Sequence, residues 1–321
     1  MESTKNKVPS GAIQLYNLFI HGEIDRRAFL EGLQKFATSS MAVAALAEAL
    51  MPNYAAAQQV SRTDERIKAG YETVPSPQGN GSIKGYLVRP VSADSRDAKP
   101  AKLPGILVVH ENRGLNPHIE DVTRRFALAG FMAFAPDGLT SAGGFPGDDY
   151  RGGQMFSKID GKKMFEDMVA AALWLKGRAD CTGKIAVTGF CYGGSVSNNL
   201  AVRLGTDLSA AVPFYGGAPA AKEDVAKIKA AILVHHGELD TRLAQAWPAY
   251  DAALKEANVT HEGYIYPGAV HGSIATPPRS GTIRPPPIWH GDVRWTGSIS
   301  TRGDDRPRPC SRRVIRLGSS M

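Results

Sequence analysis

A cysteine stands at the centre of a glycine-rich turn, Gly189-Phe190-Cys191-Tyr192-Gly193-Gly194. The turn lies between an expected strand ending at Thr188 and an expected helix beginning near Gly193. It matches the G-x-S-x-G nucleophile-elbow pattern, with Cys in place of Ser. The glycines permit a strained turn, and the helix N-terminus favours a thiolate at its centre. We therefore predict Cys191 as a nucleophile, with the backbone amide of Tyr192 placed to bind an oxyanion. The alternative is a buried structural cysteine.

The acid and the base of a catalytic triad are expected after this nucleophile, in that order along the chain. Asp240 follows the expected strand 231–234, and His271 lies in a loop after the expected strand 263–266. We predict that His271 is the general base and that Asp240 orients it. Glu238 is the alternative acid, and its other role would be a solvated loop charge.

Two adjacent histidines, His235 and His236, compete with His271 on residue type. Both lie at the end of the strand that carries the expected acid. We therefore predict that they are hydrogen-bonded core or loop histidines.

A carboxylate, Glu111, follows the first expected parallel strand and should stand near Cys191. A neighbouring carboxylate discourages thiolate formation. We predict that Glu111 holds the resting thiol protonated until substrate displaces it. The alternative is an ion pair between Glu111 and Arg113 or Arg124.

The elements around these residues alternate between strand and helix, which predicts an α/β fold. The sheet should be doubly wound, mostly parallel and covered on both faces. Expected strands span residues 83–88 (an edge strand), 105–109, 131–135, 184–188, 210–214, 231–234 and 263–266. Expected helices span residues 119–129, 162–176, 193–204 and 244–257.

With these motifs the chain resembles the dienelactone hydrolase (carboxymethylenebutenolidase) family of the α/β-hydrolase superfamily, over roughly residues 71–272. The resemblance is to exported or uncharacterised bacterial members. It is carried by the segments Val109-His110-Glu111-Asn112-Arg113-Gly114, Ala135-Pro136-Asp137-Gly138, Thr188-Gly189-Phe190-Cys191-Tyr192-Gly193-Gly194, Gly237-Glu238-Leu239-Asp240 and Val270-His271-Gly272.

The resemblance implies that the triad predicted above cleaves carboxylic esters or lactones through a thioester intermediate. It gives Glu111 the role of the thiol's resting partner. It also implies that the backbone amides of Asn112 and Tyr192 form the oxyanion hole.

The composition and charge of the chain argue against several other classes of protein. The 321 residues fit an ordinary globular α/β protein, and no stretch is long and apolar enough to span a bilayer. The cysteines Cys181, Cys191 and Cys310 are widely spaced, which argues against a disulfide framework or a zinc site. Most of the net charge of +7 comes from residues 272–321, so it does not indicate nucleic-acid binding by the folded body. We expect a small ester or lactone as the partner and no metal or cofactor.

Residues 1–60 differ from the rest of the chain. Asp25-Arg26-Arg27-Ala28-Phe29-Leu30 has the twin-arginine pattern, residues 41–51 are moderately apolar, and Ala55-Ala56-Ala57 offers a cleavage site. We predict a twin-arginine signal and a periplasmic or exported protein. The alternative is an amphipathic helix capped by Asp25 in a cytoplasmic protein.

Residues 273–321 are rich in Pro and Arg and lack apolar periodicity. Members of the resembled family continue instead from His-Gly into Phe-His, a turn and a last helix. If one nucleotide is restored after the Gly272 codon, one permitted reading begins Phe-His-Ser-Asp and continues into an amphipathic helix. We predict a single-base deletion or sequencing error there, which resequencing of the gene tests. The alternative is a genuine disordered basic tail.

Two other functions are alternatives to a working hydrolase. Loss of the last helix would uncover apolar sheet surface and leave a catalytically impaired pseudoenzyme. Cys191 could also serve in thiol redox chemistry or sensing, although no resolving cysteine lies at motif distance.

Overall fold

The computed structural model describes residues 9–20, 22–37, 42–50, 58–91, 102–269 and 271–272. The tail 273–321, predicted to be out of frame, lies outside these ranges. The predicted cleavage sequence Ala55-Ala56-Ala57 also lies outside them. Both therefore stay predictions.

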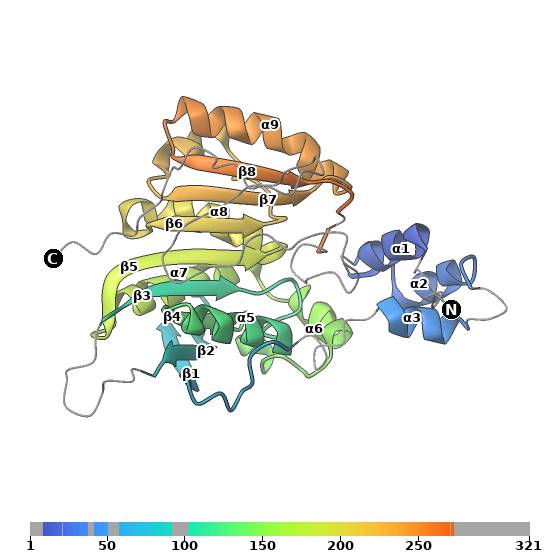
Figure 1. The fold of residues 1–321 in the computed structure, drawn as a ribbon, viewed down its shortest axis with the longest axis horizontal. Coiled ribbons are helices and arrows are strands. Elements are labelled where there is room, and N and C mark those ends of the chain that lie inside the picture. The colour runs from blue at the N-terminus through green and yellow to red at the C-terminus, as the bar shows by residue number, and fades with distance from the viewer. Residues whose placement is uncertain are drawn as a thin grey trace, which may run out of the picture.

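The described residues contain an eight-stranded sheet in the order β1-β2-β4-β3-β5-β6-β7-β8 (Figure 1). The pairs β1–β2 and β2–β4 are antiparallel, and the other neighbouring pairs are parallel. The prediction of a mostly parallel α/β sheet is confirmed. The strands are β1 (Ile67–Ser76), β2 (Gly81–Pro90), β3 (Leu103–Val109), β4 (Met132–Pro136), β5 (Cys181–Phe190), β6 (Ala210–Phe214), β7 (Ala231–Gly237) and β8 (His261–Tyr266).

One edge of the sheet differs from the prediction. The expected edge strand at residues 83–88 is β2, which lies inside the sheet because β1 pairs with it along its whole length. Most side chains of β1 are exposed, and only Ile67, Val74 and Ser76 are buried. This strand carries little apolar surface, so its sequence lacks the continuous apolar run that marks a buried strand.

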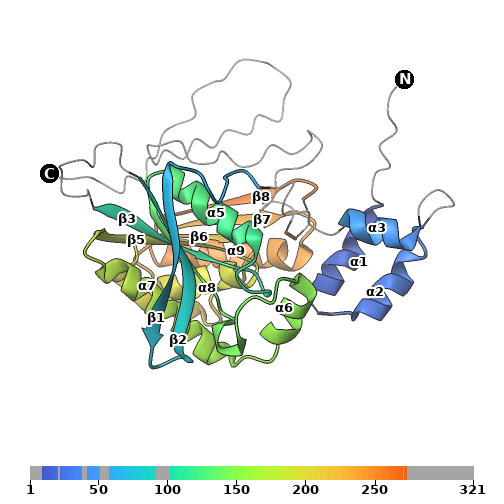
Figure 2. The same cartoon turned by 90° about the horizontal axis from the view of Figure 1, so that it is seen from below.

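Helices cover both faces of the sheet, with α5 on one face and α7 and α8 on the other (Figure 2). In β3, Leu107 and Val109 join the core beneath α7 and α8, whereas Ile106 and Val108 join the core beneath α5. The strand is buried on both faces, as parallel strands require. The body helices are α5 (Pro117–Leu128), α6 (Asp149–Phe156), α7 (Gly161–Gly177), α8 (Tyr192–Leu204) and α9 (Thr241–Glu256), and short 3-10 turns lie at η1 (Thr140–Ala142), η2 (Gly205–Asp207) and η3 (Lys222–Lys227).

The chain reverses its direction of travel across the sheet between β3 and β5. From β3 it adds β4 on one side, and it then returns to place β5 on the other side of β3. Open parallel sheets bind ligands at such a reversal, beyond the carboxyl ends of the strands. The loop after β3 and the turn after β5 therefore meet where a ligand site is expected.

The N-terminal helices have a small apolar cluster of their own and lie beside the body next to α6 (Figures 1 and 2). Asp25 is the N-cap of α2, and its carboxylate accepts a hydrogen bond of 2.8 Å from the backbone N–H of Ala28. Arg26 and Arg27 are exposed. This is the capped helix that the alternative to an export signal describes, and export itself stays a prediction. The helices are α1 (Ser10–Ile20), α2 (Arg26–Leu33) and α3 (Val43–Leu50).

The chain that follows the expected leader is anchored on α5. The carboxylate of Asp121 accepts hydrogen bonds from the backbone amides of Gln59, at 3.1 Å, and Val60, at 2.9 Å. The buried guanidinium of Arg124 donates to the carbonyl of Val60 at 2.9 Å. The folded body therefore includes residues upstream of the predicted start at residue 71. Within the described ranges, no helix combines the length and apolarity needed to cross a membrane.

Candidate active site

Cys191 occupies the sharp turn between β5 and α8. Its backbone has φ 54° and ψ −111°, in the positive-φ region that a non-glycine residue rarely adopts. Its N–H donates to the carbonyl of Phe214 at 3.1 Å, and its own carbonyl accepts from the N–H of Ser195 at 3.1 Å. The strained turn is thus held by β6 on one side and by α8 on the other. The thiol is partly exposed at the helix N-terminus.

The glycines of this turn are required by close backbone approaches. A Cβ on Gly189 would lie 2.2 Å from the carbonyl oxygen of Gly193, and a Cβ on Gly193 would lie 2.3 Å from that of Val109. A Cβ on Gly194 would lie 2.4 Å from the carbonyl oxygen of Phe214. No side chain can occupy such space, so the glycine spacing read from the sequence reflects the crossing of strands and helix.

Asp240 and His271 meet beyond the ends of β7 and β8. Asp240 is the N-cap of α9, and its carboxylate is hydrogen-bonded to Nδ1 of His271. The two loops are also joined through Glu238, whose carboxylate accepts from the backbone N–H of Gly268 at 2.8 Å. Glu238 therefore supports the loop that carries His271, a role that neither sequence-based alternative anticipated.

The imidazole of His271 carries a strongly raised pKa. Burial lowers it, but hydrogen bonds to Asp240 and to Cys191 outweigh burial and raise the pKa of His271 to about 9. For Asp240, burial raises the pKa, and the hydrogen bond and charge of His271 outweigh it and hold the pKa below its usual range. The structure thus brings the three residues of the predicted triad together, with the imidazole of His271 interacting with both the carboxylate of Asp240 and the sulfur of Cys191.

His235 and His236 are buried core residues, as predicted. The Nδ1 of His235 lies 2.9 Å from the hydroxyl of Tyr266, and its ring stacks on Phe214 at 4.4 Å. Burial lowers the pKa of His235 to about 3 and that of His236 to about 4. Both rings are neutral at physiological pH, which suits packing rather than proton transfer.

Glu111 is engaged by two residues that the sequence did not rank as central. Its carboxylate accepts a hydrogen bond of 3.1 Å from the hydroxyl of Tyr215 and forms an ion pair of 3.6 Å with Arg113. The structure therefore contains the Arg113 ion pair that was the alternative for this residue. Burial opposes ionisation, but Arg113, His118, Tyr215 and His271 together hold the pKa of Glu111 below its usual range. Glu111 is thus a partly buried anion that interacts electrostatically with the imidazole of His271.

Tyr215 could have been noticed only from the structure. Its φ of 39° places another non-glycine residue in the left-handed region, directly after β6. Its ring packs edge-on against His271, with 4.7 Å between ring centroids. It therefore contacts both Glu111 and His271, yet its sequence context contains no motif that marks it.

Asp137 and His110 hold the loops around the site. Asp137 accepts hydrogen bonds from the backbone amides of Leu115 at 3.2 Å and Leu139 at 3.0 Å, and Nε2 of His110 accepts from the amide of Gly138 at 2.8 Å. These contacts tie the loop after β3 to the loop after β4. Both residues belong to segments that carried the family resemblance, but sequence alone gave them no role.

The two backbone amides that are predicted to form the oxyanion hole follow β3 and β5, the neighbouring strands between which the chain reverses its direction across the sheet. Tyr192 is the first residue of α8, so its N–H belongs to the first helical turn, where backbone donors lack intrahelical acceptors. Asn112 follows Glu111 and lines a cavity of about 720 Å³. Their joint action on a carbonyl oxygen stays a prediction.

This arrangement can supply a nucleophile, a proton carrier and backbone hydrogen-bond donors. The side chains come from loops that follow β3 and β5 to β8. Among the described residues, no group of three or more His, Cys, Asp or Glu side chains is arranged to hold a metal ion. A thiol, an imidazole and a carboxylate arranged in this way are typical of enzymes that carry out nucleophilic acyl transfer.

The family model described as "Dienelactone hydrolase family" matches residues 83–283, which is more than half of the chain. The chain is 30% identical to the "Putative carboxymethylenebutenolidase" of Escherichia coli O157:H7 over 226 residues, covering 66% of this chain and 80% of that protein. It is 52% identical over 120 residues to the "Putative hydrolase fragment YghX" of Escherichia coli strain K12, covering 37% of this chain and 97% of the fragment.

The fold is similar to the crystal structure of "Putative Dienelactone Hydrolase" from Klebsiella pneumoniae subsp. pneumoniae MGH 78578. The two structures superpose with a TM-score of 0.55 at 28% sequence identity, covering 65% of this chain and 89% of the other. Sequence and fold comparisons thus point to one and the same family.

Proposed function

This chain belongs to the dienelactone hydrolase family, and from that premise we propose that it hydrolyses carboxylic esters or lactones through a thioester on Cys191. The family establishes a hydrolase, and the ester chemistry is our inference. The observation that supports it is one imidazole, His271, which is hydrogen-bonded to Asp240 through Nδ1 and interacts with Cys191. A thiol nucleophile needs a base and a carboxylate orienter in that order.

Acylation begins when His271 holds the proton of the Cys191 thiol and the thiolate attacks the ester carbonyl carbon. The carbonyl oxygen becomes an oxyanion, which the backbone amides of Asn112 and Tyr192 stabilise. The carbon–oxygen bond then breaks, and the leaving alkoxide or enolate takes the proton from His271. The acyl group is left on sulfur as a thioester.

Deacylation reverses these roles with water as the nucleophile. The neutral imidazole of His271 removes a proton from water, and the hydroxide attacks the thioester carbonyl. The carbon–sulfur bond breaks, the acid is released, and the Cys191 thiolate regains its place beside the imidazolium. A thiolate leaves readily, so activated esters and enol lactones are better substrates than amides.

Glu111 is proposed to restrain the nucleophile before substrate binds. It is a partly buried anion that interacts electrostatically with His271, and a second anion nearby disfavours the thiolate. Substrate that displaces Glu111, or screens it, would release the thiolate only when an ester is present. Tyr215 and Arg113 are the residues that hold Glu111 in its present position.

The test is hydrolysis of p-nitrophenyl acetate and dihydrocoumarin by the full chain and by Cys191→Ala. We expect the variant to lose at least about 10³-fold in kcat/KM, because the nucleophile is removed. Iodoacetamide should label Cys191 stoichiometrically as activity disappears. Cys181→Ala is the matched control, since Cys181 is a buried thiol at the start of β5 and should retain wild-type rates.

Full activity in Cys191→Ala would refute the nucleophile assignment. A wild-type protein that is inert towards both substrates would favour the pseudoenzyme instead. Labelling of Cys191 that leaves hydrolysis unchanged would also refute the proposed thioester route.

A further inference from the structure

A cavity of about 720 Å³ lies between the N-terminal helices and the body of the hydrolase. Residues of α1 and α2 line it, and both helices precede residue 83, where the match to the family begins. α1 and α6 lie side by side in both views (Figures 1 and 2). The aromatic residues of the cavity wall are Tyr16, Phe19, Phe145, Tyr150 and Phe156.

Helix α1 is fixed to the body by a stack of rings. Phe19 stacks on Tyr150 of α6, with 5.5 Å between ring centroids and 16° between planes. On its other side Phe19 stacks on Phe29 of α2, at 4.6 Å and 8°. One side chain thus belongs to the cluster of the N-terminal helices and to the cavity wall at the same time.

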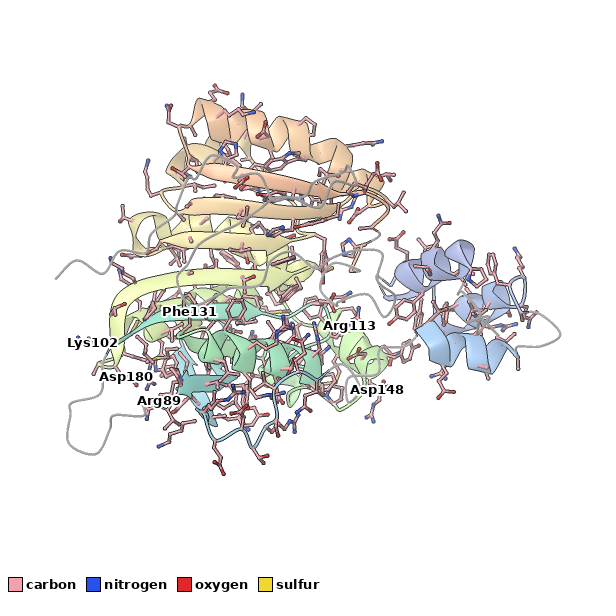
Figure 3. All side chains as sticks on the ribbon, viewed as in Figure 1. Arg89, Lys102, Arg113, Phe131, Asp148 and Asp180 are labelled. Atoms are coloured by element: carbon pink, nitrogen blue, oxygen red, sulfur yellow. The ribbon has the colours of Figure 1, made fainter. Side chains whose placement is uncertain are left out.

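A polar contact between α1 and the body runs through Arg113. The guanidinium of Arg113 is hydrogen-bonded to the hydroxyl of Tyr16 and pairs with Asp149 at 3.2 Å and with Glu111 at 3.6 Å. The Arg113 side chain is 8% exposed. Figure 3 shows it on the side of the body that faces the N-terminal helices, close to Asp148. Arg113 therefore connects α1 to the anion of the active site.

The cavity also lies beside the loop that follows β3. Its lining includes Asn112, one of the two amides expected to hold the oxyanion. It also includes Phe156, whose ring meets that of Tyr192 edge-on at 4.9 Å. A group that enters the cavity therefore lies beside Asn112, and one ring of the wall contacts Tyr192, the residue that follows Cys191.

The residues that line the cavity are suited to binding an uncharged and flat chemical group. Five rings offer stacking surface, and the charge of Arg113 is already balanced by Glu111 and Asp149. The remaining charges of the lining are of mixed sign, with Asp25 and Asp148 against Arg26. With Asp149 and Arg113 included, the lining carries three carboxylates and two guanidinium groups, so an anionic ligand would meet a net negative charge.

We propose that this cavity binds a neutral aryl group on the acyl side of the ester, and that Tyr16 and Phe19 form its outer wall. The acyl side is assigned because Asn112, whose backbone amide is expected to bind the carbonyl oxygen of the acyl group, belongs to the cavity lining. The proposal rests on the proposed function for the reaction. It applies to the uncleaved chain, because α1 and α2 precede the predicted cleavage sequence Ala55-Ala56-Ala57.

Gly153 of α6 allows the cavity to be filled from the body side. A Cβ at Gly153 would meet only the carbonyl oxygen of Asn112, at 3.8 Å, which is an ordinary contact. Gly153→Phe should therefore place a ring in the cavity without disturbing α1. Gly153→Ala adds one methyl group and should have a much smaller effect. The neighbouring Gly152 offers no such site, because a Cβ there would lie 2.3 Å from the carbonyl oxygen of Arg113.

The substrates are 2,2,2-trifluoroethyl 3-phenylpropanoate and 2,2,2-trifluoroethyl acetate, which share an activated leaving group without a ring. We expect Gly153→Phe and Phe19→Ala to lower the ratio of their kcat/KM values, aryl over acetyl, by about tenfold or more. Leu18→Ala is the matched control on α1, because Leu18 is exposed and does not line the cavity; it should leave the ratio unchanged. The assays use the full chain, with an intact mass that shows α1 still attached.

A binding measurement separates this proposal from the proposed function. Calorimetry with 3-phenylpropanamide, which is neutral and resists hydrolysis, should show binding to the full chain and at least about tenfold weaker binding to Gly153→Phe. Unchanged selectivity and unchanged amide affinity in both Gly153→Phe and Phe19→Ala would overturn the subsite. If the full chain cleaves neither ester but binds the amide, and Gly153→Phe binds the amide more weakly, the subsite is supported and the proposed ester hydrolysis is refuted.

Discussion

The proton on His271 is the feature on which the proposed chemistry depends at the scale of single residues. Its pKa of about 9 keeps the imidazole protonated at neutral pH, next to the Cys191 thiol. An imidazolium stabilises a neighbouring thiolate, as lowered cysteine pKa values beside His⁺ show in general. Asp240 supplies much of this effect, since it is itself ionised and hydrogen-bonded to the ring.

Replacing the carboxylate should move the pH dependence of the reaction. The His271 pKa lies above the ordinary 6.5, so the imidazolium persists below about pH 9 and is lost as pH rises through that value. In Asp240→Asn the pKa should fall back towards 6.5. The alkaline limb of kcat/KM should then shift from near pH 9 towards pH 7, with a rate loss of roughly 10²-fold or more at pH 8. A pH–rate profile from pH 6 to 10 measures both.

Asp251→Asn is the control for this change. Asp251 lies 3.0 Å from Nε2 of His261, so it forms another Asp–His pair away from the site. Its removal should leave the profile in place. An alkaline limb that stays near pH 9 in Asp240→Asn would contradict the assignment of the limb to His271.

Glu111 offers a second test on a single residue. If the carboxylate restrains the resting thiol, Glu111→Gln removes the anion and should speed the alkylation of Cys191 by iodoacetamide at pH 7 several-fold. Glu238→Gln is the matched control, because Glu238 supports the loop of His271 from an exposed position. Equal or slower labelling in Glu111→Gln would argue against a restraining role and for a purely structural ion pair with Arg113.

At the scale of elements, the site depends on how closely β3, β5 and α8 approach one another. Backbone of α8 lies against the carboxyl end of β3 at Gly193, and against β6 at Gly194. This approach puts the Cys191 turn next to the loop that carries Glu111 and Asn112. The position of the nucleophile is therefore set by backbone contact rather than by side-chain packing.

Gly193→Ala should break this contact. The new Cβ would lie 2.3 Å from the carbonyl oxygen of Val109, so β3 and α8 must separate. We expect a destabilisation of about 3 kcal/mol and a melting temperature lower by roughly 6–12 °C, with most of the activity lost. Gly177→Ala is the control, since no atom lies within 4 Å of a Cβ at the end of α7. An unchanged melting curve for Gly193→Ala would show that the turn tolerates a wider crossing.

At the scale of the whole molecule, the question is how the N-terminal helices and the body work together. Ring stacking between Phe19 and Tyr150 and the Tyr16–Arg113 contact join them. The first residues held by the body itself are Gln59 and Val60, on Asp121 of α5. Two folded parts are thus joined through residues 51–57, where the sequence predicts a cleavage site.

Replacement of the two arginines, Arg26 and Arg27, tests whether the protein is exported. We expect the full chain, expressed in a bacterium with a twin-arginine export system, to appear in the periplasmic fraction. Arg26→Lys combined with Arg27→Lys should keep it in the cytoplasm. Both lysines preserve the charge, and the Asp25 cap of α2 is left intact, so folding should not change. Arg66→Lys, an exposed substitution in the body, is the control. Equal cytoplasmic retention of all three proteins would favour the helical alternative.

The sequence by itself determined strands β2 to β8, helices α5, α7, α8 and α9, and the positions of the chemical groups along the chain. The turn around Cys191 could be predicted because a nucleophile elbow requires glycine at positions where any side chain would clash with neighbouring backbone. Apolar runs identified the parallel strands because these are buried on both faces. β1 escaped prediction for the opposite reason, since a mostly exposed edge strand has no such run.

Only the tertiary structure decided which partners those groups have. From the sequence, Glu111 could form an ion pair with either Arg113 or Arg124. In the structure it pairs with Arg113, because Arg124 is hydrogen-bonded to the carbonyl of Val60. Tyr215 lies in the site with a positive-φ backbone conformation, which no sequence motif predicts. The contact of α1 with the body joins residues about 100 positions apart, and local sequence patterns describe spacing along the chain, not distances across it. Long-range contacts of this kind are set by the packing of whole elements.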